Sequence, residues 1–284
     1  MLHHEKVVGM LNGDAAEHTV DVARWMKERE TCLVQQSDAV AVLAESDLQV
    51  VQAMVAGSEQ PSPRIGLVSL SGRAKLGNPT PFSSRSQLLC MGRQGVEAGV
   101  AMRWMLANVN RKVVEALGKE QGFMVLIGLG WQGPTVGTVM REARKEGMVN
   151  HSEMLSHEDI EHLYTTSKVA VVPAALGSGM SHSTLLAMTR GVPVVTTSEG
   201  VRGLAIPEEV LEDTVLVRDD PGQFAEAVVR LCEDQALWEK LSLNAMEHVR
   251  GKLTPGKWSR SFMALIDNAT QDRTKHPTGR RRQC

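Results

Sequence analysis

The sequence predicts an α/β fold, a Rossmann-like parallel sheet with flanking helices. From Leu88 onwards, short apolar runs that suit buried strands alternate with segments of helical periodicity. The clearest stretch, 169–197, reads as strand, glycine turn, helix and strand. The 284-residue composition, with 42% hydrophobic and 23% charged residues, is ordinary for a globular protein. We therefore expect strands joined by right-handed crossovers through helices.

The first 70 residues are less regular. The elements expected there are a helix over 14–36, a strand over 39–43, a short helix over 46–54 and a strand over 64–70. Residues 71–86 are rich in Ser, Gly and Pro, which is the composition of a linker. We therefore expect a boundary there, between an N-terminal part, 1–70, and a larger domain, 87–254.

The larger domain is predicted from its alternating elements. The expected strands are 88–91, 123–127, a weak one near Met148, 169–172 and 192–197. The expected helices are 100–117, 134–145, 157–165, 181–190, one that starts at Pro221 with Asp219 or Asp220 as its cap, 235–250 and 257–268. We separate a C-terminal helix, 255–270, from a basic tail, 271–284, that is expected to be disordered.

Charge, hydropathy and cysteine spacing limit the kinds of partner and the cellular compartment that we expect for this protein. A net charge of -2 argues against a nucleic-acid partner. No segment approaches the roughly 20 apolar residues of a membrane span. The four cysteines are scattered without a paired spacing, which fits a reducing compartment, so we expect a cytoplasmic protein.

The glycine turn before residue 181 has the outline of a phosphate site. In a parallel sheet such turns lie at the carboxyl ends of strands, where the next helix directs unpaired N–H groups at a ligand. Glycines allow close approach of the backbone, and hydroxyls add donors to phosphate oxygens. The candidate binding residues are Gly177, Ser178, Gly179, Ser181, Ser183 and Thr184. His182 is the histidine best placed to face such a ligand. The alternative is an ordinary crossover whose glycines serve only the turn.

Two other patterns suggest different kinds of site. Gly128, Gly130 and Gly133 form a G-x-G-x-x-G after a strand, which suggests an NAD-binding oxidoreductase, but the fingerprint normally opens the first βαβ unit and here follows the second strand. His157 and His162 resemble a zinc motif but are five residues apart, so they cannot face one metal from one helix. We expect no metal site.

Taken together, the motifs resemble the group 1 glycosyltransferases, a retaining family of GT-B fold. Q-L-L-C-M-G-R resembles the first strand of the donor domain, and F-M-V-L-I-G-L-G its second. G-S-G-M-S-H-S-T-L-L-A-M-T-R-G-V-P-V-V-T-T is the most specific part, and D-D-P-G-Q-F-A-E-A-V-V-R-L resembles the helix that follows. The resemblance covers roughly 14–255.

The resemblance implies transfer of a hexose from a nucleotide-sugar donor to an acceptor that the motifs do not identify. It implies a donor loop over 177–181, Arg93 as a phosphate partner and no requirement for a metal or other cofactor. It also implies that 1–70 is the end of an acceptor domain whose N-terminal part is incomplete, because so short a segment cannot build a domain with its own sheet. No catalytic base is identified.

The chain departs from the family at three positions. Leu186 stands where members carry a glutamate that contacts the donor, Ser183 where related G-S-G sequences carry lysine, and Ala98 near another basic position. Each lost charge-assisted contact is worth about 1.5–3 kcal/mol. A noncatalytic domain of the same fold therefore stays open as an alternative to the transferase.

Overall fold

The computed structural model describes residues 14–56, 62–71, 80–91, 96–127, 137–152, 155–175 and 179–275. The chain forms two compact units. The first comprises 1–71, 178–180 and 255–284, and the second comprises 72–177 and 181–254. The second unit begins inside the segment expected to be a linker, and part of that segment is ordered: a 3-10 turn, Phe82–Ser84, packs its Phe82 ring edge-on against Trp238.

The second unit is built on a parallel sheet of six strands in the order β5-β4-β3-β6-β7-β8. The strands are β3 (Ser86–Met91), β4 (Met124–Ile127), β5 (Val149–Ser152), β6 (Ser167–Val172), β7 (Val194–Thr196) and β8 (Leu216–Val217). In order of appearance this is the 3-2-1-4-5-6 arrangement of the Rossmann fold. The predicted α/β class and Rossmann-like sheet are confirmed.

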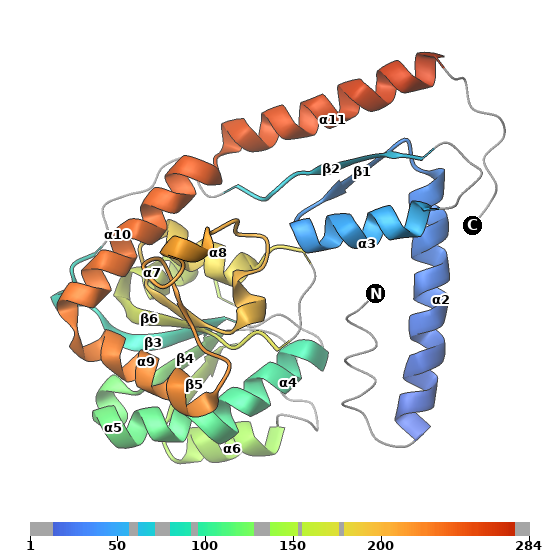
Figure 1. Ribbon diagram of the computed structural model, residues 1–284. Coiled ribbons are helices and arrows are strands. Elements are labelled where there is room, and N and C mark those ends of the chain that lie inside the picture. The colour runs from blue at the N-terminus through green and yellow to red at the C-terminus, as the bar shows by residue number, and fades with distance from the viewer. Residues whose placement is uncertain are drawn as a thin grey trace. The chain divides into compact units, whose positions relative to one another are not determined.

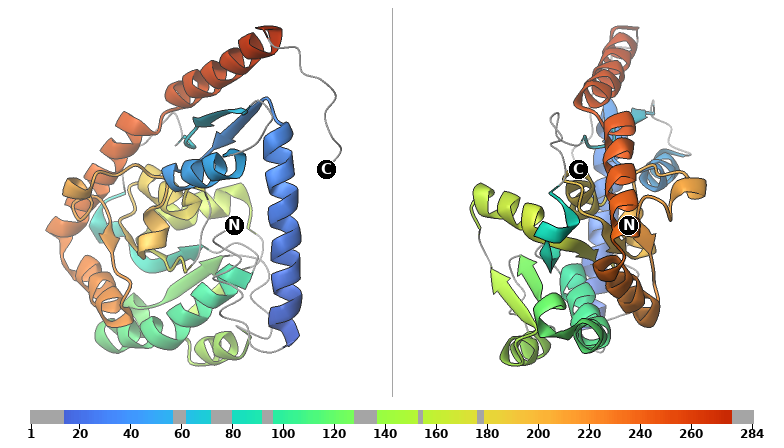
Figure 2. Two further views of the ribbon diagram at one scale, coloured as in Figure 1. Left: turned by 45° about the vertical axis from the view of Figure 1, so that its right-hand side comes forward. Right: turned by 90° about the vertical axis from the view of Figure 1, so that its left-hand side faces the viewer.

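Helices cover both faces of this sheet (Figures 1 and 2). The helical segments are α4 (Val96–Trp104), η2 (Met105–Asn110), α5 (Arg111–Gln121), α6 (Gly137–Lys145), α7 (His157–Thr166), α8 (His182–Thr189), α9 (Pro221–Glu233) and α10 (Gln235–Lys252). One layer contains η2, α5, α6 and α9, which contact one another. The other contains α7 and α8, and α10 packs against α8.

The core of the second unit lies between the strands and the first layer of helices. Leu88, Val169 and Val195 on neighbouring strands are fully buried, as are Val109 and Phe224 on the helices above them. Such strands are covered on both faces, which is why they read as continuous apolar runs in the sequence.

The helix expected over 100–117 begins earlier, at Val96, and its middle turn, Met105–Asn110, is a π-helix. Gly118, at φ +77° and ψ 168°, breaks the helix after residue 117, where the sequence predicted its end, and a further short turn runs to Gln121. A π turn adds a residue to the turn and shifts which side chains face the core. Asn110 is fully buried there, and its amide has no hydrogen-bond partner among the described residues. Periodicity alone did not predict this interruption.

Two strands at the edges of the sheet are short, and the sequence indicated them poorly. The strand expected near Met148 is β5, a polar edge strand of four residues. β8 was not predicted, because two residues carry no readable period.

The first unit joins segments from both ends of the chain. It contains α2 (Asp14–Gln36), β1 (Ala39–Val42), α3 (Glu45–Val55), β2 (Arg64–Leu67) and α11 (Pro255–Lys275), with β1 and β2 parallel. α11 lies against β2 so closely that a Cβ on Gly66 would come within 3.1 Å of Leu265 Cδ1. Arg64 also forms an ion pair with Asp272. The C-terminal helix expected over 255–270 extends to Lys275, so the prediction of a disordered tail is wrong for 271–275. The rest of the expected tail lies outside the described residues.

Side-chain caps fix the starts of three helices in the second unit. Ser156 and Asp159 form a capping box on α7, and Asp234 accepts from Leu237 N at the start of α10. Asp220 accepts from Gly222 N and Gln223 N, each at 2.9 Å, with Pro221 at the first position of α9. Of the two aspartates proposed for this cap, the structure selects Asp220.

Asp220→Ala should lower the free energy of unfolding by about 1 kcal/mol, because two N–H groups at the start of α9 lose their acceptor. Urea unfolding followed by circular dichroism measures the change. Gln223→Ala, a substitution in the same turn that leaves the cap in place, is the matched control. Equal stability of the Asp220→Ala variant and the wild type would show that the cap does not stabilise the helix.

His248 should make stability depend on pH. Its Nε2 donates to Leu204 O at 2.7 Å, and partial burial lowers the pKa of the imidazole below its usual value, with Lys252 adding to the effect. The folded protein therefore resists protonation more than the unfolded chain, whose histidine titrates near pH ~6.5. The contribution of neutral His248 to the free energy of unfolding is therefore present above about pH 6.5 and is lost as the pH falls below it. His248→Gln, which keeps a donor, should flatten this part of the profile in denaturant titrations at about pH 5 and pH 7. An unchanged slope would exclude His248 as its cause.

Candidate functional site

The order of the sheet places its topological switch point at the carboxyl ends of β3 and β6. These two strands are paired, but the chain leaves β3 towards β4 on one side and leaves β6 towards β7 on the other. Ligands of open α/β sheets bind where the connections diverge in this way. Arg93 follows β3 by two positions, and Gly177 and Ser178 follow β6. These three residues lie outside the described part of the chain.

Gly179 is the described glycine of the predicted donor loop. Its φ of +68° lies in the left-handed region, where glycine carries no steric penalty. Its N–H donates to Asp47 Oδ2 at 2.8 Å, and a Cβ would come within 3.3 Å of Leu43 Cδ1. Gly179 groups with the first unit, as these contacts with α3 and the residues before it indicate. The backbone angle therefore favours glycine, and a Cβ would also require a small shift of the Leu43 side chain.

The start of α8 differs from the capped helices described above. Ser181 occupies the N-cap position, but its side chain makes no hydrogen bond to the first N–H groups of the helix. Its own N–H donates to Arg202 O at 3.0 Å, which ties this turn to the loop after β7. The first N–H groups of α8 therefore receive no acceptor from the capping side chain. Such groups are suited to an anion.

The hydroxyl groups that were predicted to bind phosphate differ in their exposure to solvent. Thr184 is fully buried, and its Oγ1 donates to Gly200 O at 2.6 Å. That hydroxyl therefore serves the fold, and its assignment as a phosphate donor needs correction. Ser181 and Ser183 are half-buried, and His182 is exposed at the first position of the helix. The diphosphate-binding roles of Ser181 and Ser183 stay predictions.

Gly200 is a site residue that the sequence patterns did not single out. It lies in the 3-10 turn Ser198–Val201 after β7, and a Cβ there would fall 1.7 Å from Thr196 Oγ1. No larger residue fits unless the Thr196 hydroxyl, which donates to Val172 O at 2.8 Å, moves away. The signal was present as S-E-G-V-R-G directly after a buried strand.

The far end of α8 is held by an ion pair. Arg190 bonds both carboxylate oxygens of Glu161 on α7, and its guanidinium lies 4.4 Å from the centre of the Tyr164 ring. Leu186, between the two ends of α8, is half-buried. Its side chain cannot accept a hydrogen bond, as the sequence indicated.

The structure also tests whether the described residues carry a cysteine nucleophile, a metal site or a membrane-spanning helix. Burial raises the pKa of the Cys90 and Cys232 thiols to about 12, so neither is a thiolate nucleophile at neutral pH. No three His, Cys, Asp or Glu side chains gather as metal ligands in the described ranges. No described helix is long and apolar enough to cross a membrane.

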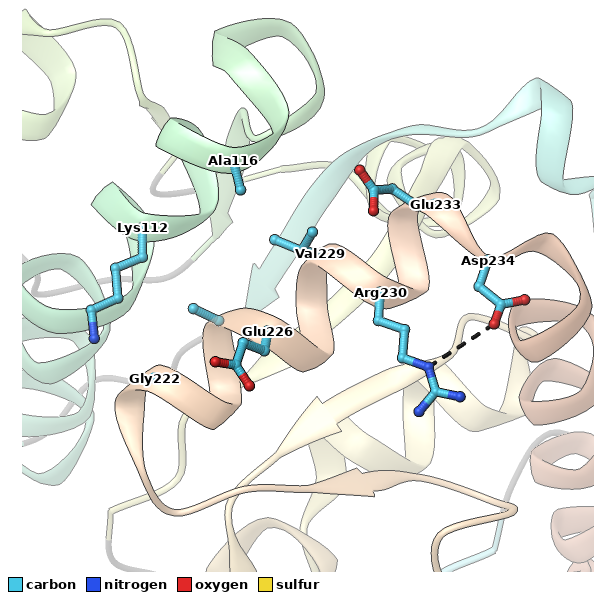
Figure 3. A pocket seen from close by; sticks show the side chains of 9 residues that line it. Lys112, Ala116, Gly222, Glu226, Val229, Arg230, Glu233 and Asp234 are labelled. Carbon is cyan, nitrogen blue, oxygen red and sulfur yellow. Dashed lines mark ion pairs between the residues drawn. The ribbon is translucent and has the colours of Figure 1, made fainter.

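A groove of about 590 Å³ lies between α5 and α9 (Figure 3). Small side chains such as Ala116 and Ala225 line it together with Lys112, Glu226 and the ion pair of Arg230 with Asp234. None of the predicted site residues that the structure describes, Gly179, Ser181, Ser183 and Thr184, lines this groove.

The alternative dinucleotide fingerprint is misplaced in the sheet. Gly128, Gly130 and Gly133 follow β4, which is the second strand in order, whereas the connections diverge between β3 and β6. The glycines themselves lie outside the described residues. The position of β4 argues against the NAD-binding interpretation.

The chain is similar to glycosyltransferases in sequence and structure. Over 103 residues it is 28% identical to the "Putative glycosyltransferase YtcC" of Bacillus subtilis (strain 168), a match that covers 36% of this chain and 25% of that protein. Sucrose-phosphate synthase from Thermosynechococcus elongatus superimposes with a TM-score of 0.65 at 20% identity, over 94% of this chain and 66% of the synthase. TarM from S. aureus superimposes with a TM-score of 0.64 at 15% identity, over 80% of this chain and 43% of TarM.

The matched part of each of these three proteins is less than two thirds of its length, from 25% to 66%. The structural likeness supports the fold. The sequence model of the family described as "Glycosyl transferases group 1" matches residues 85–234, just over half of the chain and most of the second unit. The chain belongs to the group 1 glycosyltransferase family.

Proposed function

We propose that this chain binds a nucleotide sugar at the carboxyl ends of β3 and β6 and transfers its hexose to an acceptor. The observation that carries the proposal is the start of α8, which the Ser181 side chain leaves uncapped, two positions after a glycine held at positive φ. Two similar structures support it: TarM was solved in complex with UDP, and so was the pneumococcal O-GlcNAc transferase GtfA, with UDP and GlcNAc.

In this proposal the diphosphate lies against the first turn of α8. Main-chain N–H groups there carry partial positive charge and need no reorganisation when negative charge develops on the departing diphosphate. Arg93, which follows β3, would supply a full positive charge. Ser183 would add a hydroxyl. No metal or other cofactor is assigned to the site, and no residue is assigned as a base.

A noncatalytic domain of the same fold is the second candidate, and two positions favour it. Leu186 cannot accept a hydrogen bond from a ligand, and Ser183 carries no charge. Binding without turnover would identify this case. Absence of any nucleotide binding would contradict both the transferase and a donor-binding role.

Gly179→Ala should weaken the binding of UDP or GDP at least about tenfold, because a Cβ at φ +68° strains the loop and approaches Leu43. Isothermal titration calorimetry with UDP, GDP and NAD measures the affinities. NAD is included because its binding would restore the oxidoreductase interpretation.

Gly147→Ala is the matched control for this prediction. Gly147 has a φ of +71°, and a Cβ there meets nothing within 4 Å, so the backbone strain is similar but the donor loop is untouched. The two variants should lose comparable stability, and only Gly179→Ala should lose affinity. Equal nucleotide affinity in both variants would remove Gly179 from the site.

If the chain is an active transferase, slow hydrolysis of a UDP-sugar or GDP-sugar should continue in the presence of EDTA. Released nucleoside diphosphate is the measured product, with and without chelator. The physical reason is that helix N–H groups and Arg93, rather than a metal ion, would stabilise the leaving group. Loss of activity in EDTA that added Mg²⁺ restores would contradict the metal-independent part of the proposal.

A further inference from the structure

Three groups at the start of α8 form a chain of hydrogen bonds. Ser181 Oγ and Thr184 Oγ1 are 2.9 Å apart, and Thr184 Oγ1 is 2.6 Å from Gly200 O. Thr184 is fully buried, so no ligand reaches its hydroxyl. We refer to Ser181, Thr184 and Gly200 as the hydroxyl relay.

The direction of the relay follows from counting protons. A carbonyl oxygen only accepts, so Thr184 must donate its single hydroxyl proton to Gly200 O. Thr184 Oγ1 then has no proton left for Ser181. The bond between the two hydroxyls therefore runs from Ser181 Oγ as donor to Thr184 Oγ1 as acceptor.

Ser181 Oγ is consequently an acceptor towards anything else that approaches it. Its proton is engaged by Thr184, whereas its lone pairs receive no N–H group of α8, because its side chain makes no capping bond. Ser181 is half-buried, so part of it remains accessible. A diphosphate oxygen carries no proton at neutral pH and cannot bond such a group, but an alcohol can.

We propose that Ser181 Oγ, in place of the phosphate-donor role predicted from the sequence, accepts a hydrogen bond from a hydroxyl of the bound nucleotide sugar, and that Thr184 is the positioning residue that keeps Ser181 in this role. The inference rests on the proposed function. Two kinds of group at the start of α8 then have different roles: main-chain N–H groups bind the anionic oxygens, and Ser181 Oγ binds a sugar hydroxyl. Both the ribose and the hexose carry hydroxyls, and the experiment distinguishes between them.

The test measures discrimination between a nucleotide sugar and its deoxy analogues. UDP-sugars and GDP-sugars are titrated into the full chain, and the ligand that binds is then compared with analogues that lack single hydroxyls, on the ribose in one arm and on the hexose in the other. In the wild type one deoxy analogue should bind about fivefold more weakly, as expected for one neutral hydrogen bond.

Four variants locate the cause of that discrimination. Ser181→Ala should reduce the fivefold ratio to about one, because it removes the acceptor. Thr184→Val should lower the ratio by less, because the Ser181 hydroxyl keeps its lone pairs but is no longer held in one orientation. Thr184→Ser keeps the relay and should keep the ratio. Thr189→Val is the matched control, because it removes another buried hydroxyl of α8. That hydroxyl donates to Leu185 O at 2.7 Å from the last turn of the helix, whereas the relay involves its first turn.

The outcomes separate this inference from the function on which it rests. If no UDP-sugar or GDP-sugar binds the wild type, the proposed function fails and the inference fails with it. If a nucleotide sugar binds but no deoxy analogue is disfavoured, or Ser181→Ala leaves the ratio unchanged, the inference alone is wrong. A ratio that falls equally in Thr189→Val would assign the effect to general loosening of α8 and would also overturn it.

Discussion

The pairing of β3 with β6 is the constraint on which the second unit depends. It sets the point where the connections diverge and so decides which loops can meet a ligand. Arg85, just before β3, stabilises the start of this strand pair. It is only 3% exposed and donates to Tyr164 O and to Ser167 O at the start of β6. Its guanidinium also lies over the Trp238 ring. Burial lowers its pKa to about 10, which still leaves the guanidinium charged at neutral pH.

Sequence reasoning succeeded where local patterns carry the structure. Continuous apolar runs predicted β3, β4, β6 and β7, and Asp220 with Pro221 predicted the start of α9. Sequence reasoning failed where a feature of the structure depends on contacts between residues far apart in the chain. The association of α11 with β2 depends on Leu265 meeting Gly66 across most of the chain, and no periodicity encodes that contact. Likewise, the sequence showed hydroxyls near the glycine turn but not that Thr184 faces inward.

The departures from the family pattern affect side chains more than main chain. Leu186 and Ser183 remove side-chain contacts, whereas the features that Gly179 and the start of α8 supply belong to the backbone. A helix N-terminus attracts an anion whatever its side chains are, although more weakly than a site with added cations. In a transferase, backbone groups must therefore supply most of the free energy of donor binding. A noncatalytic domain does not need that contribution.

The hydroxyl relay also makes the site depend on a second loop. Thr184 and the N–H of Ser181 both bond carbonyls in the segment after β7, those of Gly200 and Arg202. Gly200 in turn packs against Thr196 on β7, whose Oγ1 occupies the space of a Cβ and donates to Val172 O. In the proposed site, the orientation of the Ser181 hydroxyl is thus set by the buried Thr184 and by the segment after β7.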